Sequence, residues 1–384
     1  MNGSNVPAGP LSSNRANDRV RMGVIGSINL DLIIRTPDFP EPGETVLGGP
    51  FETAPGGKGA NQAIAAARLG ADVVMLGRVG DDDAGRTMRR TLEADRVRLI
   101  TPATPESADA STPGAGSTGV AVITVNAGGE NTIVVAPGAN ATLTPDDVDR
   151  FLDEYADAFD VVLMQLEVPP QVVSHAVMQL ARKQPGQCRH QQQRSQEQVR
   201  AHRSADFAAE AVSIARPIIA LNAAPAPAID APLSDDLLRM LDVLIVNQTE
   251  AWQVLQGLGN GQSTSPKGAK DNASAIAVAL LRAGPSEVVL TLGAEGAIVA
   301  HRCAKGELET AYQPAFHVRT VDTTAAGDAF SAAYCLQRAA GQTIEDALRF
   351  ACAAGSLAAS RPGATPSLPN RAEVEAKASG IATV

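Results

Sequence analysis

The chain has 384 residues, of which 44% are hydrophobic, and these are enough for the buried core of one large domain or of two ordinary ones. Its 42 acidic residues exceed its 32 basic ones, and the net charge of −10 argues against a partner that is a nucleic acid or an anionic membrane surface. No apolar run reaches the ~18 residues of a membrane-spanning helix, and the 4 cysteines form no CxxC pair typical of a zinc site. We therefore expect a globular, cytoplasmic protein with reduced thiols.

Short apolar segments in the first half of the chain predict strands. Residues 1–20 are rich in Ser, Asn and Pro, lack the apolar core of a signal peptide and are expected to be disordered. Residues 22–28 form a short buried strand, and alternation places Asn29 and Asp31 on one face at its C-terminal end. Ligands bind at this end of strands in an open α/β sheet, so both side chains are candidate ligand contacts, although a surface turn would explain them equally well.

Two further segments indicate a second, smaller sheet. Residues 30–55 contain several prolines and glycines between short apolar stretches. Residues 120–125 and 132–136 flank an Asn-Ala-Gly-Gly-Glu-Asn turn and are typical of a β-hairpin. Because these pieces interrupt a chain that otherwise alternates strands and helices, we predict a small β-sheet lid, built from about 30–55 and 120–136 and inserted into the main domain.

From residue 161 onward the chain alternates between apolar strands and helices. Four strands are expected, over residues 161–166, 218–221, 243–246 and 288–292. Each is followed by a polar residue or a glycine, namely Glu167, Asn222, Asn247 and Gly293. This pattern predicts an α/β fold with a largely parallel central sheet, flanked by helices and binding ligands at one edge. We expect one domain over residues 21–384.

Residues 184–212 depart from this alternation. They are rich in Gln, Arg, His, Ser and Glu and contain few large apolar residues, which indicates a polar low-complexity insertion. Cys188, His190 and His202 lie within it without the spacing of metal ligands, so we interpret them as incidental. We expect the protein to tolerate deletion of this segment.

Residues 321–330, Val-Asp-Thr-Thr-Ala-Ala-Gly-Asp-Ala-Phe, place small residues and a carboxylate where a helix is predicted to start. The N-terminal end of a helix has unpaired backbone N–H groups and the positive end of the dipole, and small side chains let a phosphate approach them. We therefore interpret Ala325, Ala326 and Gly327 as an anion hole with the base Asp328 at its rim. An ordinary N-cap role for Asp328 is the alternative.

Residues 55–61, Pro-Gly-Gly-Lys-Gly-Ala-Asn, form a second glycine-rich stretch before a predicted helix. This stretch and residues 322–330 together resemble the two signatures of the ribokinase-like (PfkB) family of sugar and nucleoside kinases. The first signature is matched by Gly56, Gly57, Asn61, Ala63, Gly70 and Gly80. A P-loop is absent, since Lys58 is followed by Gly59 instead of Ser or Thr.

The resemblance implies a ribokinase-like fold and an ATP-dependent sugar kinase, with D-ribose phosphorylated at its 5-hydroxyl as the expected reaction. It implies Asp328 as the general base and residues 325–328 as the anion hole. It also implies a sugar-binding set of Asn29, Asp31, Gly57, Lys58, Gly59, Ala60, Asn61, Glu167 and Asp328. Another sugar kinase, such as a fructokinase or a deoxyribokinase, is the alternative, and a non-catalytic sugar-sensing relative is a third hypothesis.

The resemblance further implies ATP, Mg²⁺ and a monovalent K⁺ ion as cofactors. The ATP-binding set would be Asn247, Glu250, Thr291, Leu292, Gly293, Ala294, Glu295, Gly296, Gly327, Asp328 and Cys352. A helix N-cap with a capping box explains the spacing of Asn247 and Glu250 as well, and both roles are compatible. The K⁺ site would comprise Asp322, Thr324, Ala358, Arg361, Gly363 and Ser367. A homodimer that pairs through the lid is expected.

Overall fold

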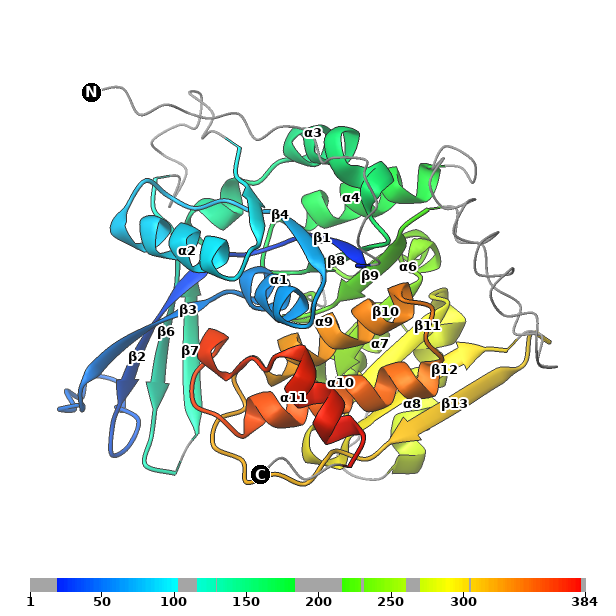
Figure 1. Ribbon diagram of the computed structural model, residues 1–384. Helices are drawn as coiled ribbons and strands as arrows, with labels where there is room; N and C mark the ends of the chain where they lie inside the picture. Colours follow the sequence, from blue (N-terminus) through cyan, green and yellow to red (C-terminus); the bar gives the residue numbers. More distant parts are fainter. Residues whose placement is uncertain are drawn as a thin grey trace.

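A nine-stranded sheet runs through the computed structural model, which describes residues 19–102, 116–128, 130–183, 216–228, 231–259, 270–303 and 305–380. Its strands follow the order β13-β12-β11-β10-β9-β8-β1-β4-β5 (Figure 1). Their bounds are Arg21–Ile25 (β1), Asp72–Leu76 (β4), Arg98–Ile100 (β5), Val161–Gln165 (β8), Ile218–Asn222 (β9), Val243–Asn247 (β10), Glu287–Thr291 (β11), Ala297–Arg302 (β12) and Leu308–Gln313 (β13). Neighbouring strands from β5 across to β11 are parallel. β12 is antiparallel to both of its neighbours, β11 and β13, so the predicted largely parallel sheet is confirmed.

Helices cover both faces of this sheet because its strands are apolar on both faces. Along β8, Val161 and Leu163 pack into one core cluster, and Val162 and Met164 pack into the other. The first cluster is covered by α1 (Lys58–Arg68), α2 (Asp83–Ala94), α9 (Ala326–Ala339), α10 (Ile344–Ala359) and α11 (Arg371–Ala378). The second is covered by α3 (Pro145–Tyr155), α4 (Pro170–Arg182), α6 (Asp235–Met240), α7 (Gln248–Gly257) and α8 (Lys270–Ala283).

The strand order reverses beside β1, which pairs with β4 on one side and with β8 on the other. A crevice opens beyond the carboxyl ends of the strands at such a switch point. The segments that leave β1, β8, β9 and β10 therefore meet at one edge of the sheet. This edge is where the sequence predicts ligand contacts.

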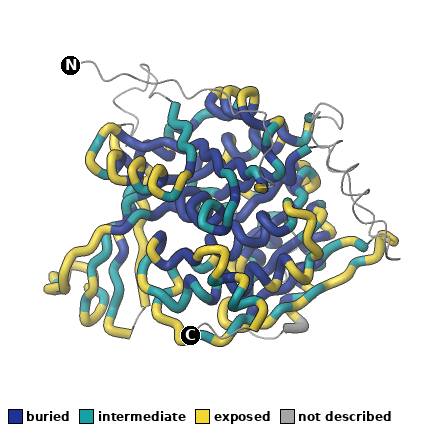
Figure 2. The backbone as a smooth tube through the Cα atoms, viewed as in Figure 1, coloured by how far each residue is buried: buried dark blue, intermediate teal, exposed yellow. Residues whose placement is uncertain are grey.

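A four-stranded sheet of order β3-β2-β6-β7 stands against that edge. It comprises β2 (Asn29–Arg35), β3 (Phe51–Gly56), β6 (Gly119–Val125) and β7 (Asn131–Ala136), and β6 and β7 form the predicted hairpin. Figure 1 shows it projecting from one side of the main body, and Figure 2 shows that much of it is exposed while the central strands of the main sheet are buried. The prediction of a second, smaller sheet is confirmed, and its role as a lid remains a prediction.

The C-terminal end of the strand expected over residues 22–28 is wrong. β1 stops at Ile25, and Asn29 and Asp31 belong to the next strand, in the smaller sheet. The backbone crosses between the sheets at residues 26–28, where the Gly26 amide donates to Leu76 O and the Ile28 amide donates to the side chain of Asn140. The predicted alternation holds, because Asn29 and Asp31 are buried on one face of β2.

Some predictions concern segments outside the described ranges. The expected disordered head lies there except for its last two residues, as does the whole insertion over residues 184–212 with Cys188, His190 and His202. The domain boundaries at residues 21 and 384 likewise remain predictions. Among the described residues, no helix combines the length and the apolar character that crossing a membrane requires.

Candidate active site

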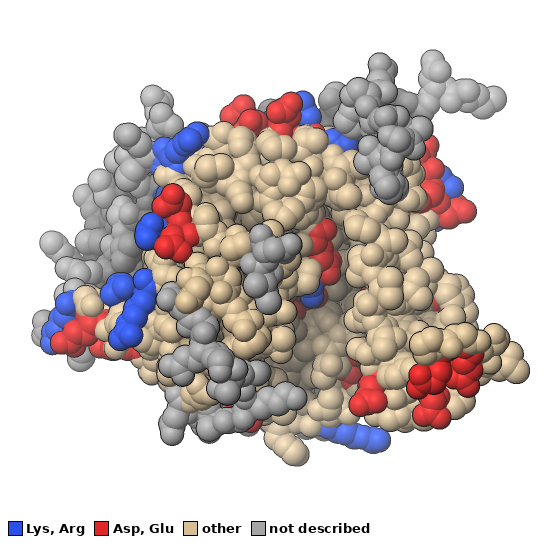
Figure 3. Space-filling view, turned by 180° about the vertical axis from the view of Figure 1, so that it is seen from behind, with Lys and Arg blue, Asp and Glu red and all other residues tan. Residues whose placement is uncertain are grey.

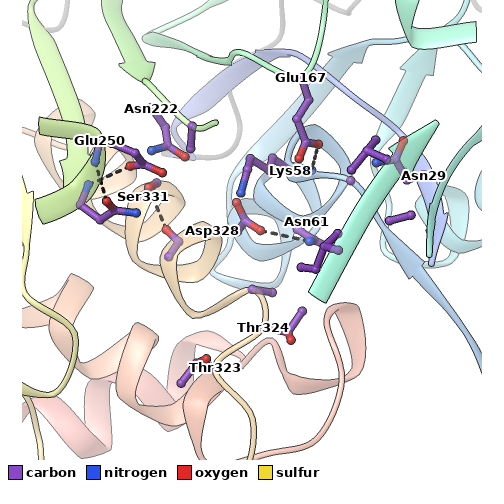
Figure 4. Close-up of a pocket in the computed structure, with 18 of the residues that line it drawn as sticks. Asn29, Lys58, Asn61, Glu167, Asn222, Glu250, Thr323, Thr324, Asp328 and Ser331 are labelled. Atoms are coloured by element: carbon purple, nitrogen blue, oxygen red, sulfur yellow. Dashed lines mark hydrogen bonds between the residues drawn. The ribbon is translucent and has the colours of Figure 1, made fainter. Parts of the chain in front are cut away.

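A cavity of about 320 Å³ lies between the smaller sheet and the carboxyl edge of the main sheet. Figure 3 shows a hollow near the middle of one face of the molecule, with acidic and basic side chains beside it. The predicted site residues that line the cavity are Asn29, Asp31, Gly57, Lys58, Asn61, Glu167, Asn247, Glu250, Thr291, Thr324, Ala325, Gly327 and Asp328. Residues from both glycine-rich stretches, far apart in the sequence, therefore face one space (Figure 4).

Asp328 lies in the first turn of α9 with its side chain in the cavity (Figure 4). The N-cap of this helix is Ala325, in a left-handed conformation with φ 59°, and Asp328 is three residues further on. Its two carboxylate oxygens accept hydrogen bonds from Asn61 Nδ2 at 3.0 Å and from Gln62 Nε2 at 2.9 Å. The N-cap interpretation of Asp328 is therefore wrong, because this carboxylate is held by side chains of α1.

The first turn of α9 is open toward the cavity. No side chain of the described residues caps it, and the Ala326 amide donates to Thr323 O at 3.2 Å. A Cβ added at Gly327 would meet nothing within 4 Å, so there is free space beside the helix end. Helix N-termini bind anions through their free N–H groups and dipole, and this end has the small residues that such binding needs.

The first turn of α1 is closed by the protein itself. The Lys58 amide donates to Glu167 Oε2 at 3.1 Å, and the Ala60 amide donates to Ser27 O at 2.9 Å. A Cβ at Gly59 would lie 2.6 Å from the backbone of residues 26 and 27, so only glycine fits here. Gly57 has φ 88°, which an L side chain rarely adopts. Gly59 and Ala60 are buried in this packing, so the structure brings their neighbours to the cavity but not these two residues.

The charges around the cavity are mostly negative. Among its described lining residues, Lys58 is the single basic side chain, facing the acidic Asp31, Glu167, Glu250 and Asp328. Burial lowers the pKa of Lys58, but the nearby carboxylates, Asp328 first, outweigh it, so the net pKa is raised and the ammonium stays charged. Burial raises the pKa of Asp328, whereas Lys58 and the hydrogen bonds from Gln62 and Asn61 lower it in part.

The smaller sheet supplies a second pair of polar groups. Asn29 Oδ1 accepts a hydrogen bond from Asn140 Nδ2 at 2.8 Å, which leaves the Asn29 amide nitrogen to donate into the cavity. Asp31 is buried, and burial together with Glu167 and Asp328 raises its pKa from 3.8 to about 7. Glu167 is fixed at Oε2 by Ser27 Oγ, at 2.6 Å, and by the Lys58 amide. These side chains form a donor and acceptor set suited to hydroxyl groups.

The predicted nucleotide residues are only partly brought together. Asn247 caps α7 and forms a capping box with Glu250, as the sequence allows, and both still line the cavity together with Thr291. The turn Gly293–Glu295 follows β11, with Gly293 and Gly296 at positive φ. Of the predicted ATP-binding residues, the ones outside the cavity lining are Leu292, Gly293, Ala294, Glu295, Gly296 and Cys352. Cys352 is buried on α10 with its Sγ 3.8 Å from Gln313 O, and burial raises its pKa to about 12.

The predicted cation residues join two loops. Asp322 accepts hydrogen bonds from the Thr324 amide and hydroxyl and, at its other oxygen, from the Gly363 amide at 2.9 Å. These bonds keep the pKa of Asp322 low despite its partial burial. Arg361 pairs with Glu373, and Ser367 Oγ donates to Ala364 O. Of this set only Thr324 lines the cavity, while Asp322, Ala358, Arg361, Gly363 and Ser367 lie outside it.

Several residues of the site escape prediction from the sequence. Gln62 is fully buried and donates to Asp328, although its only sequence signal is its place directly after Asn61. The sequence identifies Asn222 only as the polar residue that follows a strand and indicates no role for it, but the structure places it in the cavity lining. The apolar wall of the cavity comes from the smaller sheet, through Ala121, Ile123, Ile133 and Val135. The alternation of residues along the hairpin predicts which side chains share a face of the sheet, but it does not predict which of the two faces lies against the cavity.

Comparison with known proteins agrees with this geometry. The sequence matches the pfkB family of carbohydrate kinases over residues 21–218 and 204–371. It is 33% identical to a ribokinase of Haemophilus influenzae and 36% identical to one of Bacillus subtilis, in each case over 92% of this chain and 97% of the relative. The structure of Arabidopsis thaliana ribokinase complexed with ribose and ATP matches with a TM-score of 0.68 and 25% identity, over 94% of this chain and 99% of that one. The predicted enzyme class, an ATP-dependent carbohydrate kinase, is confirmed, and the chain belongs to the pfkB family of carbohydrate kinases.

Proposed function

We propose that this protein transfers the γ-phosphoryl group of ATP to the 5-hydroxyl of D-ribose. The observation that carries the proposal is the position of the Asp328 carboxylate, held by two amide donors beside an uncapped helix end. The opposite wall of the cavity presents Asn29 and Asp31, a donor and an acceptor for sugar hydroxyls. The names of the relatives, ribokinases of bacteria and of a plant, support ribose over other sugars.

In this mechanism Asp328 accepts the proton of the attacking hydroxyl, a role worth roughly 10²–10⁴ in rate. Phosphoryl transfer requires mainly positioning and stabilisation of charge on the transferred group. The Ala326 amide is occupied by Thr323 O, so the backbone N–H groups of Gly327 and Asp328 at the open helix end would provide the fixed donors for that charge. Lys58, with its raised pKa, adds a positive charge within the same space.

The acidity of the cavity fits a requirement for Mg²⁺ with ATP. Four carboxyl groups and one lysine line it, so a bare triphosphate would meet net repulsion. Glu250 uses Oε2 in the capping box, and its other oxygen is available to a metal ion or to its water ligands. A bound Mg²⁺ would neutralise part of the charge on the phosphates of ATP. We assign Asn247 and Glu250 to the metal-phosphate end of the nucleotide.

The Asp322 loops fit a K⁺ ion through backbone carbonyls. Both carboxylate oxygens of Asp322 already accept protein hydrogen bonds, and Arg361 is paired with Glu373. The charge of Asp322 is nevertheless retained next to the segment that leads into α9. A bound cation would hold residues 322–328 in place, and we expect activity to be higher in potassium than in sodium buffer at equal ionic strength.

The outer face of the smaller sheet fits an interface between two copies of the chain in the cytoplasm. Val122 and Val134 are register partners on adjacent strands, and both are exposed on the face opposite to the cavity, as is Phe51 nearby. Exposed apolar sheet faces of this kind mark association surfaces. Sedimentation of the wild type should show a dimer, and Val134→Lys should show a monomer.

A phosphorylation screen with D-ribose, 2-deoxyribose, fructose and adenosine tests the proposed substrate. We expect D-ribose to give the highest kcat/KM, with phosphate on the primary hydroxyl. If fructose or adenosine exceeds ribose by more than about tenfold, equivalent to about 1.4 kcal/mol, the ribose assignment is wrong. No transfer to any sugar, with ribose still binding, would favour the non-catalytic sugar-sensing hypothesis.

A further inference from the structure

Gln62 joins the base Asp328 to two strands of the main sheet. It is fully buried in α1, directly after Asn61, and its Nε2 donates both to Asp328 Oδ1 at 2.9 Å and to Asn222 Oδ1 at 3.0 Å. Its Oε1 accepts from Gln165 Nε2, the last residue of β8, at 2.5 Å. We propose that Gln62 is a positioning residue, which keeps the carboxylate of Asp328 oriented and ionised for proton transfer.

The charge on Asp328 determines which group donates and which accepts in each hydrogen bond of this network. An ionised carboxylate only accepts, so Gln62 must turn its amide nitrogen toward it. The Gln62 oxygen then faces Gln165, which must in turn present its own nitrogen. Asn222 completes the branch, since its Oδ1 accepts from Gln62 while its Nδ2 donates to Ile245 O at 3.2 Å.

The network leaves one buried oxygen without a partner among the described residues. Gln165 Oε1 is buried and accepts no hydrogen bond. It lies over Gly26, where an added Cβ would come within 1.8 Å of it. A buried acceptor without a donor costs free energy, and an apolar side chain at position 165 would avoid that cost. The protein retains this cost at a residue that fixes the orientation of the Gln62 amide, which supports a role in the site over a role in stability.

Four charged groups surround Asp328 and also influence its protonation. Lys58 favours the ionised form, whereas Glu167, Asp31 and Glu250 oppose it. Gln62 differs from Lys58 because it is neutral and has its two hydrogen atoms directed to fixed acceptors. Loss of its amide should therefore change the protonation of Asp328 without changing the charge of the cavity.

The test is the pH dependence of kcat at saturating ribose and ATP with Mg²⁺, which reports groups in the ternary complex. The inference rests on the proposed function, so Asp328→Asn is measured in parallel. For Gln62→Leu we expect the acid limb of the profile to move up by about one pH unit, with kcat up to about tenfold lower on that limb and largely recovered at alkaline pH. Gln337→Leu, a buried glutamine on α9 outside this network, should leave the limb in place.

The outcomes separate the two proposals. If Asp328→Asn keeps wild-type activity, the proposed base is wrong. If Asp328→Asn is inactive but Gln62→Leu loses activity equally at every pH, or not at all, then the positioning role is wrong while the base remains. If Gln62→Leu does not fold, Gln165→Met is measured instead, because it removes the hydrogen bond that Gln165 donates to Gln62 and leaves the Gln62 side chain in place. We expect a smaller shift of the acid limb in the same direction, and an unmoved limb overturns the inference.

Discussion

The first turns of α1 and α9 look alike in sequence and differ in what completes them. Both follow a run of small residues, and both face the same cavity. At α1 the protein supplies the anion, because Glu167 accepts from the Lys58 amide, and the backbone of residues 26 and 27 packs against Gly59. At α9, within the part of the chain that the structure describes, no side chain caps the turn and the space beside Gly327 is free.

The difference supports our proposal that the end of α1 is structural support and that the end of α9 binds the phosphate. Both ends carry the positive part of a helix dipole, and each is stabilised by negative charge nearby. The charge at α1 is covalently part of the chain. At α9 the carboxylate of Asp328 is turned to Asn61 and Gln62, and we propose that a bound ligand supplies the negative charge there. A glycine-rich helix start therefore predicts an anion site only where no internal carboxylate occupies it.

The largest effect on activity is expected from substitution of Asp328, the proposed base in the first turn of α9. Asp328→Asn preserves the shape of the side chain and removes its capacity to accept a proton. We expect kcat to fall by roughly 10²–10⁴ with the affinity for ATP nearly unchanged. Steady-state kinetics and calorimetric titration of ATP measure the two quantities. A variant that melts like wild type and keeps more than about a tenth of its kcat would contradict the role of Asp328 as base.

A matched pair of glycine substitutions separates the closed end from the open one. Gly59→Ala brings a methyl group within 2.6 Å of neighbouring backbone, so we expect a loss of up to about 3 kcal/mol in the free energy of unfolding. Gly327→Ala places the same methyl group in open space inside a helix, and we expect unchanged or slightly higher stability. Urea denaturation of both variants measures this contrast, and equal losses would show that the two ends are packed alike.

A smaller effect concerns the pH dependence of stability. Burial raises the pKa of Asp31 to about 7, so the folded protein binds this proton more tightly than the unfolded chain does. The resulting stabilisation is full below the unfolded pKa, declines as pH rises and is lost above about 7. Between about pH 5 and about pH 8 the ligand-free protein should lose about 2 to 3 kcal/mol through this group. Asp31→Asn should remove that part of the loss, and an identical pH dependence in both proteins would refute the assignment.

The sequence predicts the main sheet well because apolar runs and alternation are local signals. Val161 to Leu166 form the predicted strand with only its last residue changed. The sequence alone places Asn29 at the end of the first strand, whereas it belongs to the next one. The passage of the backbone from one sheet to the other at residues 26–28 depends on Asn140 and Leu76, which are distant in sequence. For the same reason the sequence could not exclude an N-cap role for Asp328, since Asn61 and Gln62, which hold its carboxylate, lie more than 260 residues away. It could not reveal Gln62 either, whose partners come from β8, β9 and α9.

The most direct test of the difference between the two helix ends is the backbone amide signal of Gly59 and of Gly327. Protein labelled with ¹⁵N-glycine would be titrated with a non-hydrolysable ATP analogue and Mg²⁺ without sugar, and Gly→Ala variants would assign the two signals. We expect a large downfield shift of the Gly327 amide proton as it donates to phosphate, and little change at Gly59. A shift at Gly59 with none at Gly327 would contradict this expectation.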